Sequence, residues 1–109
     1  LFIADPRPLL RRLLDAGSRA EAGSGKEAAP LALLFHEAVA LASLSGARRM
    51  RSHTACNRIA LGGGVFQNLL LRDLLVPLLI NDGFEVFLNE AVPPGDGGIS
   101  LGQAWYAER

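Results

Sequence analysis

At residues 61–68 the chain reads Leu61-Gly62-Gly63-Gly64-Val65-Phe66-Gln67-Asn68. A short apolar run ends at Leu61, and a leucine-rich stretch follows Asn68. Glycines between a strand and a helix let the backbone approach a bulky polar ligand, and the first turn of the helix directs unpaired N–H groups toward it. The pattern therefore predicts a strand at 58–61, a tight turn and a helix, with a site for phosphate or a nucleotide at the turn.

A second glycine-rich turn, Val92-Pro93-Pro94-Gly95-Asp96-Gly97-Gly98, follows about thirty residues later, after the alternating run 84–88 that is typical of a strand. This spacing suits one βαβ unit, whose right-handed crossover makes its two strands parallel. Both turns then lie at the carboxyl ends of the strands, on one edge of the sheet. We expect them to form two walls of one cleft. Since parallel sheets usually have more than two strands, the rest of the sheet must lie elsewhere.

The first half of the chain is predicted to be helical with one interruption. Asp5-Pro6 is a helix-start signal, and leucines at helical spacing continue to Gly17. Residues 17–30 lack periodicity and are predicted to be a flexible surface loop. Residues 31–45 form a wide apolar face that indicates a buried helix, which Gly46 ends. The basic residues that follow are interpreted as a solvated helix end or loop: Arg48, Arg49 and Arg51.

Two further helices are expected after the glycine turn. The leucine-rich stretch predicts a helix from about Gln67 to Asn81, although Pro77 lies inside it. A proline within a helix removes a hydrogen bond and clashes with the preceding turn, so we expect a kink or break near Val76. A closing helix follows from Gly98, and Asp96 is a candidate for its start.

Composition excludes several classes of function. Half of the 109 residues are hydrophobic, which is enough for the core of one domain or part of one. Eleven Lys plus Arg balance eleven Asp plus Glu, so no long-range field favours nucleic acid or an anionic membrane. Cys56 is the single cysteine, which rules out an internal disulfide or a cysteine zinc site and favours a reducing cytoplasm. No apolar run approaches the length of about eighteen residues that a membrane span needs. Because the chain opens at Leu1, it is interpreted as a piece of a longer protein.

Three stretches together carry a resemblance to a known family: Ile59-Ala60-Leu61-Gly62-Gly63-Gly64-Val65-Phe66-Gln67-Asn68, Gly83-Phe84-Glu85-Val86, and Val92-Pro93-Pro94-Gly95-Asp96-Gly97-Gly98-Ile99-Ser100-Leu101-Gly102-Gln103-Ala104. In order and spacing they resemble the C-terminal part of the Kae1-like domain of the [NiFe]-hydrogenase maturation carbamoyltransferases, the HypF family. Residues 32–40 and 5–10 agree more loosely. The implied fold is α/β, a partial lobe of the acetate kinase, Hsc70 and actin (ASKHA) superfamily with parallel strands and flanking helices. Residues 1–109 would form the C-terminal portion of that domain.

The resemblance also implies an activity. Enzymes of this family use carbamoyl phosphate and ATP to make carbamoyl adenylate, and then carbamoylate the C-terminal cysteine of a HypE-like acceptor protein. Dehydration of that group supplies the cyanide ligands of the [NiFe] centre. The full enzyme also has an acylphosphatase-like domain, a YrdC-like domain and zinc-finger segments that hold zinc. The chain alone is expected to be inactive.

Residue roles follow from the same resemblance. It implies that Gly62, Gly63 and Gly64 let backbone amides approach the adenylate phosphate and ribose, and that Gln67 or Asn68 binds the nucleoside. It also implies that Asp96 is the carboxylate ligand of a divalent metal. The family takes its other metal ligands from a His-x-x-x-His motif in the preceding lobe, and His36 and His53 do not form such a pair. No catalytic residue is assigned. This sequence has Gly62 where the family often has Ser, and Gly95 where it often has Asn.

Plainer interpretations remain open for individual residues. The glycines of 62–64 also suit a simple strand-to-helix turn, and Asp96 also suits a helix cap. His36 lies on an apolar helix and is better explained as a hydrogen-bonded core residue than as a metal ligand. Cys56 is better explained as a buried, inert thiol than as a nucleophile.

Two other functions are alternatives to the transfer of a carbamoyl group to a protein thiol. The first is an O-carbamoyltransferase of natural-product biosynthesis, or another ATP-using enzyme of the superfamily, which would act on a small hydroxylated acceptor. The second is a non-catalytic association module in which the glycine turns bind nothing. Apolar surface left by missing sheet neighbours would favour self-association of the chain in either case.

Overall fold

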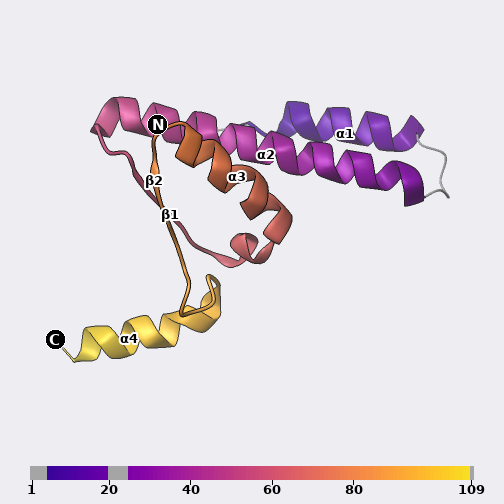
Figure 1. Ribbon diagram of the computed structural model, residues 1–109. Coiled ribbons are helices and arrows are strands. Elements are labelled where there is room, and N and C mark those ends of the chain that lie inside the picture. Colours follow the sequence, from indigo (N-terminus) through magenta and orange to yellow (C-terminus); the bar gives the residue numbers. More distant parts are fainter. Residues whose placement is uncertain (1–4, 20–24, 109) are drawn as a thin grey trace.

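The computed structural model describes residues 5–19 and 25–108. The chain forms two long helices, then a strand–helix–strand unit, and then a separate final helix (Figure 1). The elements in order are α1 (Arg7–Arg19), α2 (Gly25–Thr54), β1 (Arg58–Leu61), the 3₁₀ turn η1 (Gly64–Gln67), α3 (Leu69–Asn81), β2 (Glu85–Leu88), the 3₁₀ turn η2 (Asp96–Gly98) and α4 (Ile99–Ala107).

The two strands form a parallel pair, as the sequence predicts. Arg58 pairs with Glu85 and Leu61 with Leu88, and α3 makes the crossover between the strands. Side chains alternate across the sheet, so that Ile59 and Leu61 pack toward the helices while Ala60 is exposed. The expectation of an α/β unit with a parallel crossover is therefore confirmed. Both glycine-rich turns leave the sheet at the carboxyl ends of the strands.

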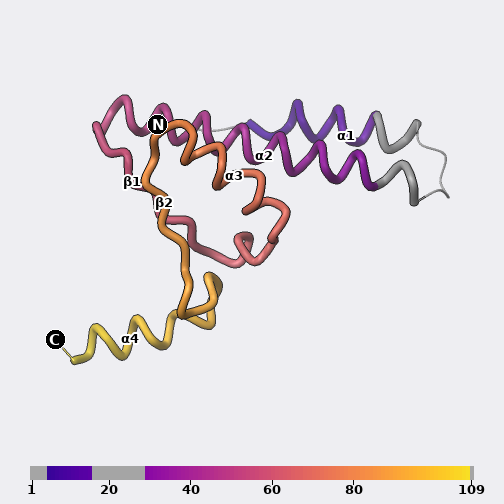
Figure 2. The backbone as a smooth tube through the Cα atoms, in the orientation of Figure 1, coloured from indigo at the N-terminus to yellow at the C-terminus, as the bar shows by residue number. Residues whose placement is uncertain are grey.

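The core lies between α2, α3 and the sheet. Leu71, Leu75 and Leu79 are spaced four residues apart, so they share one face of α3 and are all buried. Leu75 and Leu79 are only 1% and 2% exposed. The remaining buried residues come from α2, β1 and the residue before β2: Ala40, Leu44, Leu61 and Phe84. Helix α3 packs against β2 and α2 packs against α3, and these contacts fix the position of the turn that joins β1 to α3 (Figure 2).

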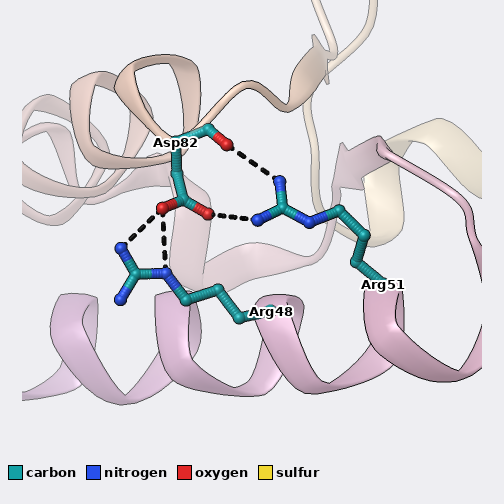
Figure 3. A network of polar contacts seen from close by, with 3 residues as sticks. All are labelled: Arg48, Arg51 and Asp82. Atoms are coloured by element: carbon teal, nitrogen blue, oxygen red, sulfur yellow. Dashed lines mark hydrogen bonds and ion pairs between the residues drawn. The ribbon is translucent and has the colours of Figure 1, made fainter.

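A charged cluster at the end of α3 joins that helix to α2 (Figure 3). Arg48 Nε donates to Asp82 Oδ1 at 2.9 Å, and Arg51 Nη2 donates to Asp82 Oδ2 at 2.7 Å. Arg51 also donates to the Asp82 carbonyl oxygen at 2.8 Å and lies 4.1 Å from the centre of the Phe84 ring. The hydrogen bond from Arg48 is the main cause that lowers the pKa of Asp82. The sequence suggested that these arginines are solvated. The structure shows instead that Arg48 and Arg51 bind the turn after α3.

Three predicted helix boundaries are wrong. Residues 17–30 were expected to be a loop, but α1 continues to Arg19 and α2 already begins at Gly25; residues 20–24 lie outside the described part of the chain. The helix expected to end at Gly46 continues to Thr54. A glycine inside a helix costs about 1 kcal/mol relative to alanine. The packing of Leu44 and the bonds of Arg48 and Arg51 stabilise the helix by more than this cost. Tertiary contacts on both sides of Gly46 therefore keep the helix continuous.

The predicted break near Val76 is also wrong. Helix α3 runs without interruption from Leu69 to Asn81 with Pro77 inside it. An interior proline costs about 3 kcal/mol, whereas burying one leucine side chain contributes about 1.5–3 kcal/mol. Leu75 and Leu79 are buried on either side of an exposed Pro77, so their packing keeps the helix continuous, and a kink at this position stays a prediction.

Helix α2 contains a long apolar segment. By length and composition alone, the segment Ala29–Thr54 could cross a membrane, so the expectation that the chain contains no such run is wrong. The structure gives this helix other contacts. It packs against α1 and α3 and places Ala40 and Leu44 in the core. Only 11% of its most apolar eighteen-residue window is buried, so the expectation of a buried helix at 31–45 is wrong.

Helix α4 extends away from α2, α3 and the sheet (Figures 1 and 2). None of its described residues is buried, and Trp105 and Tyr106 are 65% and 83% exposed. The turn η2 connects α4 to the rest of the structure.

Candidate nucleotide-binding site

The first wall of the site is the glycine turn after β1. Gly63 has φ 98° and ψ 158°, a backbone conformation that is almost confined to glycine. A Cβ atom built on Gly62, Gly63 or Gly64 meets no atom within 4 Å. The turn therefore needs glycine at 63 for its conformation and exposes its backbone on an open surface. Such a surface allows a bulky ligand to approach the main chain.

The second glycine turn contacts the first directly. The Gly63 N–H donates to the Pro94 carbonyl oxygen at 2.6 Å. A Cβ atom on Gly95 would lie 3.0 Å from Gln67 Nε2 and 3.6 Å from Gly64 Cα, so a larger residue there would displace the Gln67 side chain. The expectation that both turns lie together at one edge of the sheet is confirmed. Sequence reasoning did not predict the bond between them, because a main-chain contact leaves no signature in side-chain types.

Open hollows surround the contact between the turns. A small cavity of about 120 Å³ lies between the strand ends and the proline loop, and Phe66, Gln67 and Pro94 are among its lining residues. A larger hollow of about 760 Å³ continues on the α3 side along Arg72, and another of about 710 Å³ continues on the α4 side. A drug-sized ligand occupies a pocket of roughly 300–1,000 Å³, so the small cavity alone cannot hold a nucleotide. Only the small cavity borders both turns, whereas the hollow on the α4 side is lined by Pro94 and Gly95 of the second turn and the hollow on the α3 side begins at Leu88.

Asp96 is exposed in the first residue of η2. Its carboxylate makes no hydrogen bond or ion pair to any described residue. The alternative in which Asp96 serves only as a helix cap is therefore wrong, since Gly98 precedes α4 without a side-chain cap. Within residues 5–19 and 25–108, no three His, Cys, Asp or Glu side chains are grouped to hold a metal ion. The chain can offer one carboxylate ligand here, and these residues do not fit a complete metal site.

Asn68 has a clear role within the chain itself. Its Oδ1 accepts a hydrogen bond from the Leu71 backbone N–H at 3.1 Å, which caps α3. Its Nδ2 lies 2.8 Å from Nε2 of His36, a residue of α2. The sequence signal for the cap is an Asn immediately before an apolar helical run. The contact with His36 spans 32 residues along the chain, and no local pattern could have indicated it.

The other singled-out residues lie away from the turns. His53 belongs to the last turn of α2, and its Nδ1 bonds the Arg49 carbonyl oxygen at 2.7 Å. Cys56 is exposed, so the interpretation as a buried thiol is wrong. His36 is hydrogen-bonded, as the plainer interpretation expects, but it is half-buried and does not belong to the core.

Comparison with known proteins decides the family. The sequence model of one protein family, described as the second subdomain of the carbamoyltransferase Kae1-like domain, matches residues 2–103. The chain belongs to the HypF carbamoyltransferase family. It is 37% identical over 107 residues to a carbamoyltransferase HypF homolog of Cupriavidus necator, covering 98% of this chain and 26% of that protein. It is 34% identical over 103 residues to the carbamoyltransferase HypF of Rhodobacter capsulatus, covering 94% of this chain and 12% of that protein.

A solved structure of the HypF family has the same arrangement. The crystal structure of full-length HypF in the phosphate- and nucleotide-bound form aligns with a TM-score of 0.78 and 38% identity. The alignment covers 94% of this chain and 13% of that one. The chain therefore spans about a quarter or less of the length of the HypF proteins that it matches.

Proposed function

We propose that this chain forms part of a HypF-type carbamoyltransferase and contributes one side of its nucleotide site. The observation that carries the proposal is the hydrogen bond from Gly63 to Pro94, which holds two glycine-rich turns together at the carboxyl edge of a parallel sheet. Ligands of open α/β sheets bind outside this edge. The similarity to a HypF protein whose structure contains phosphate and nucleotide supports the same assignment.

In the proposed reaction the full enzyme uses carbamoyl phosphate and ATP to form carbamoyl adenylate, with release of the phosphate of carbamoyl phosphate and of pyrophosphate from ATP. The thiolate of the C-terminal cysteine of a HypE-like protein then attacks the carbamoyl carbon. The new C–S bond replaces the bond from that carbon to the phosphate oxygen, and AMP leaves with the electron pair. Dehydration of the carbamoyl group on the acceptor cysteine would then supply the cyanide for [NiFe]-hydrogenase maturation in the cytoplasm.

The glycine turn would stabilise the phosphate group of this leaving AMP. Backbone N–H groups that point at developing negative charge lower the barrier to acyl transfer. The Gly63 N–H is already bonded to Pro94, so we assign the phosphate contact to the amides of Gly62 and Gly64. Gln67 borders the same turn and is the candidate for a contact with the nucleoside. A metal bound at Asp96 would supply positive charge near the phosphate, but its remaining ligands would come from other parts of the enzyme.

Nucleotide titration of the full-length protein tests the proposal. The affinity for AMP and ATP is measured by calorimetry for the unchanged protein and for the Gly63→Val and Asp96→Ala variants. We expect Gly63→Val to weaken both ligands at least tenfold, because the side chain strains the turn. Gly83→Ala is a matched control, since Gly83 also has a positive φ of 85° but lies in the turn before β2, away from the site. Equal affinities for all variants would reject a nucleotide site at the turns and favour a simple structural role.

The identity of the acceptor needs a separate assay. Transfer of radiolabelled carbamoyl groups is followed to a HypE-like protein and to the same protein with its C-terminal cysteine changed to serine. We expect label in the first and none in the second. Label on a small hydroxylated compound instead would favour an O-carbamoyltransferase.

A further inference from the structure

The hydrogen bonds around Asn68 fix the orientation of its side chain. A backbone N–H can only donate, so the Asn68 atom that lies 3.1 Å from the Leu71 nitrogen must be the carbonyl oxygen. The other end of the amide is then the NH₂ group, which can only donate. It lies 2.8 Å from His36 Nε2, and this nitrogen must therefore carry a lone pair.

The same reasoning fixes the state of the imidazole ring. If Nε2 accepts a hydrogen bond, the proton of a neutral ring is on Nδ1. His36 Nδ1 lies 2.7 Å from the Ala32 carbonyl oxygen, which can only accept. Each donor thus meets an acceptor from Ala32 through His36 and Asn68 to Leu71. A ring protonated at Nε2 would place two donors against each other.

We propose that His36 is a positioning residue for the glycine turn. It holds Asn68 as the cap of α3, and Asn68 is the residue at which the turn of residues 62–67 joins that helix. The half-buried ring is itself held by α2, through the Ala32 carbonyl and an edge contact with Phe35 at 5.9 Å between ring centres. Helix α2 is thereby connected to the turn by a side-chain bond in addition to the apolar core.

The inference deepens the proposed function and changes the role of one residue. Both ends of the Asn68 amide are used within the chain, so Asn68 would orient the turn and Gln67 would remain as the side chain that meets the nucleoside. His36 would act without touching substrate. Its effect on ligand binding rests on the nucleotide site proposed above, whereas its effect on the mobility of the turn does not.

Four variants of the full-length protein test this role. His36→Leu removes the acceptor for Asn68 Nδ2, whereas His36→Gln retains an acceptor oxygen. His53→Leu is the matched control, because His53 Nδ1 makes the same bond to a carbonyl four residues earlier at 2.7 Å but has no contact with the turn. Asn68→Ser retains a capping oxygen and removes the amide NH₂ group that reaches His36, because the serine side chain is shorter.

Two readouts separate this inference from the proposed function. The first is hydrogen–deuterium exchange of the peptide that contains residues 62–71, measured without ligand. The second is AMP affinity. We expect His36→Leu to speed exchange and weaken AMP binding about fivefold, the typical effect of one hydrogen bond, while His36→Gln restores most of both and His53→Leu changes neither. In the Asn68→Ser background, His36→Leu should have no further effect.

Each result has a definite meaning. Faster exchange in His36→Leu, in a protein that binds no AMP, would support the positioning role and reject the nucleotide site. If the unchanged protein binds AMP, and His36→Leu shows the same exchange and the same AMP affinity as that protein, the positioning role is overturned while the nucleotide site stands. An effect of His36→Leu that persists in the Asn68→Ser background would also overturn it, because the histidine would then act through another contact.

Discussion

Replacement of Gly63 by alanine should open both glycine turns at once. Gly63 has φ 98° and ψ 158°, and a residue with a Cβ atom in this region costs about 1–3 kcal/mol. Since nothing lies within 4 Å of the added Cβ, the cost arises from the backbone and not from a clash. Relief of that strain rotates the Gly63 peptide and weakens its N–H bond to the Pro94 carbonyl, which is 2.6 Å long.

The magnitude of this change can be measured as local opening. A loss of 1–3 kcal/mol in opening free energy corresponds to roughly 5- to 150-fold faster amide exchange. Hydrogen–deuterium exchange of the full-length protein should show this increase in peptides that cover residues 61–68 and also 92–98. Gly62→Ala is the control, because Gly62 has no positive φ and a Cβ there also meets open space. Faster exchange confined to 61–68, with 92–98 unchanged, would refute the conclusion that the two turns are coupled.

Two further predictions concern the body of the fold. Leu75→Ala should lower the unfolding free energy of this unit by about 2–5 kcal/mol, because Leu75 is 1% exposed; Leu70→Ala, at a 42% exposed position on the same helix, should have a much smaller effect in the same denaturation experiment. The folded-state pKa of Asp82 is lowered by its arginine partners, so its contribution to stability is complete above its unfolded pKa of about 3.9 and is lost as the pH falls through the folded value. Asp82→Asn should therefore destabilise the unit at pH 7 and reduce the loss of stability below about pH 4; an unchanged acid profile in that variant would assign the acid sensitivity to other groups.

The strand–turn–helix–strand unit could be predicted because its signals are local. The apolar run that ends at Leu61, the glycines and the alternating run 84–88 each determine their own element. The parallel pairing follows from the length of the crossover between the strands. Relative positions along one edge of a sheet are therefore accessible from sequence even in a chain with only two strands.

The errors come from contacts between distant residues. Gly46 and Pro77 are local signals for ending a helix, but buried leucines and the Arg48–Asp82–Arg51 cluster hold the helices together across them. The same holds at the site. The cap that Asn68 forms has a local signal, but its bond to His36 depends on a helix 32 residues earlier in the chain and could not be predicted; the role of Asn68 as a ligand residue stays a prediction.

A crystal structure of the full-length protein with bound ATP tests the central claim most directly. We expect a phosphate oxygen about 2.7–3.2 Å from the backbone nitrogen of Gly62 or Gly64, with the Pro94 carbonyl still bonded to Gly63. A nucleotide bound on another face of the protein, with both glycine turns free of ligand, would contradict the account.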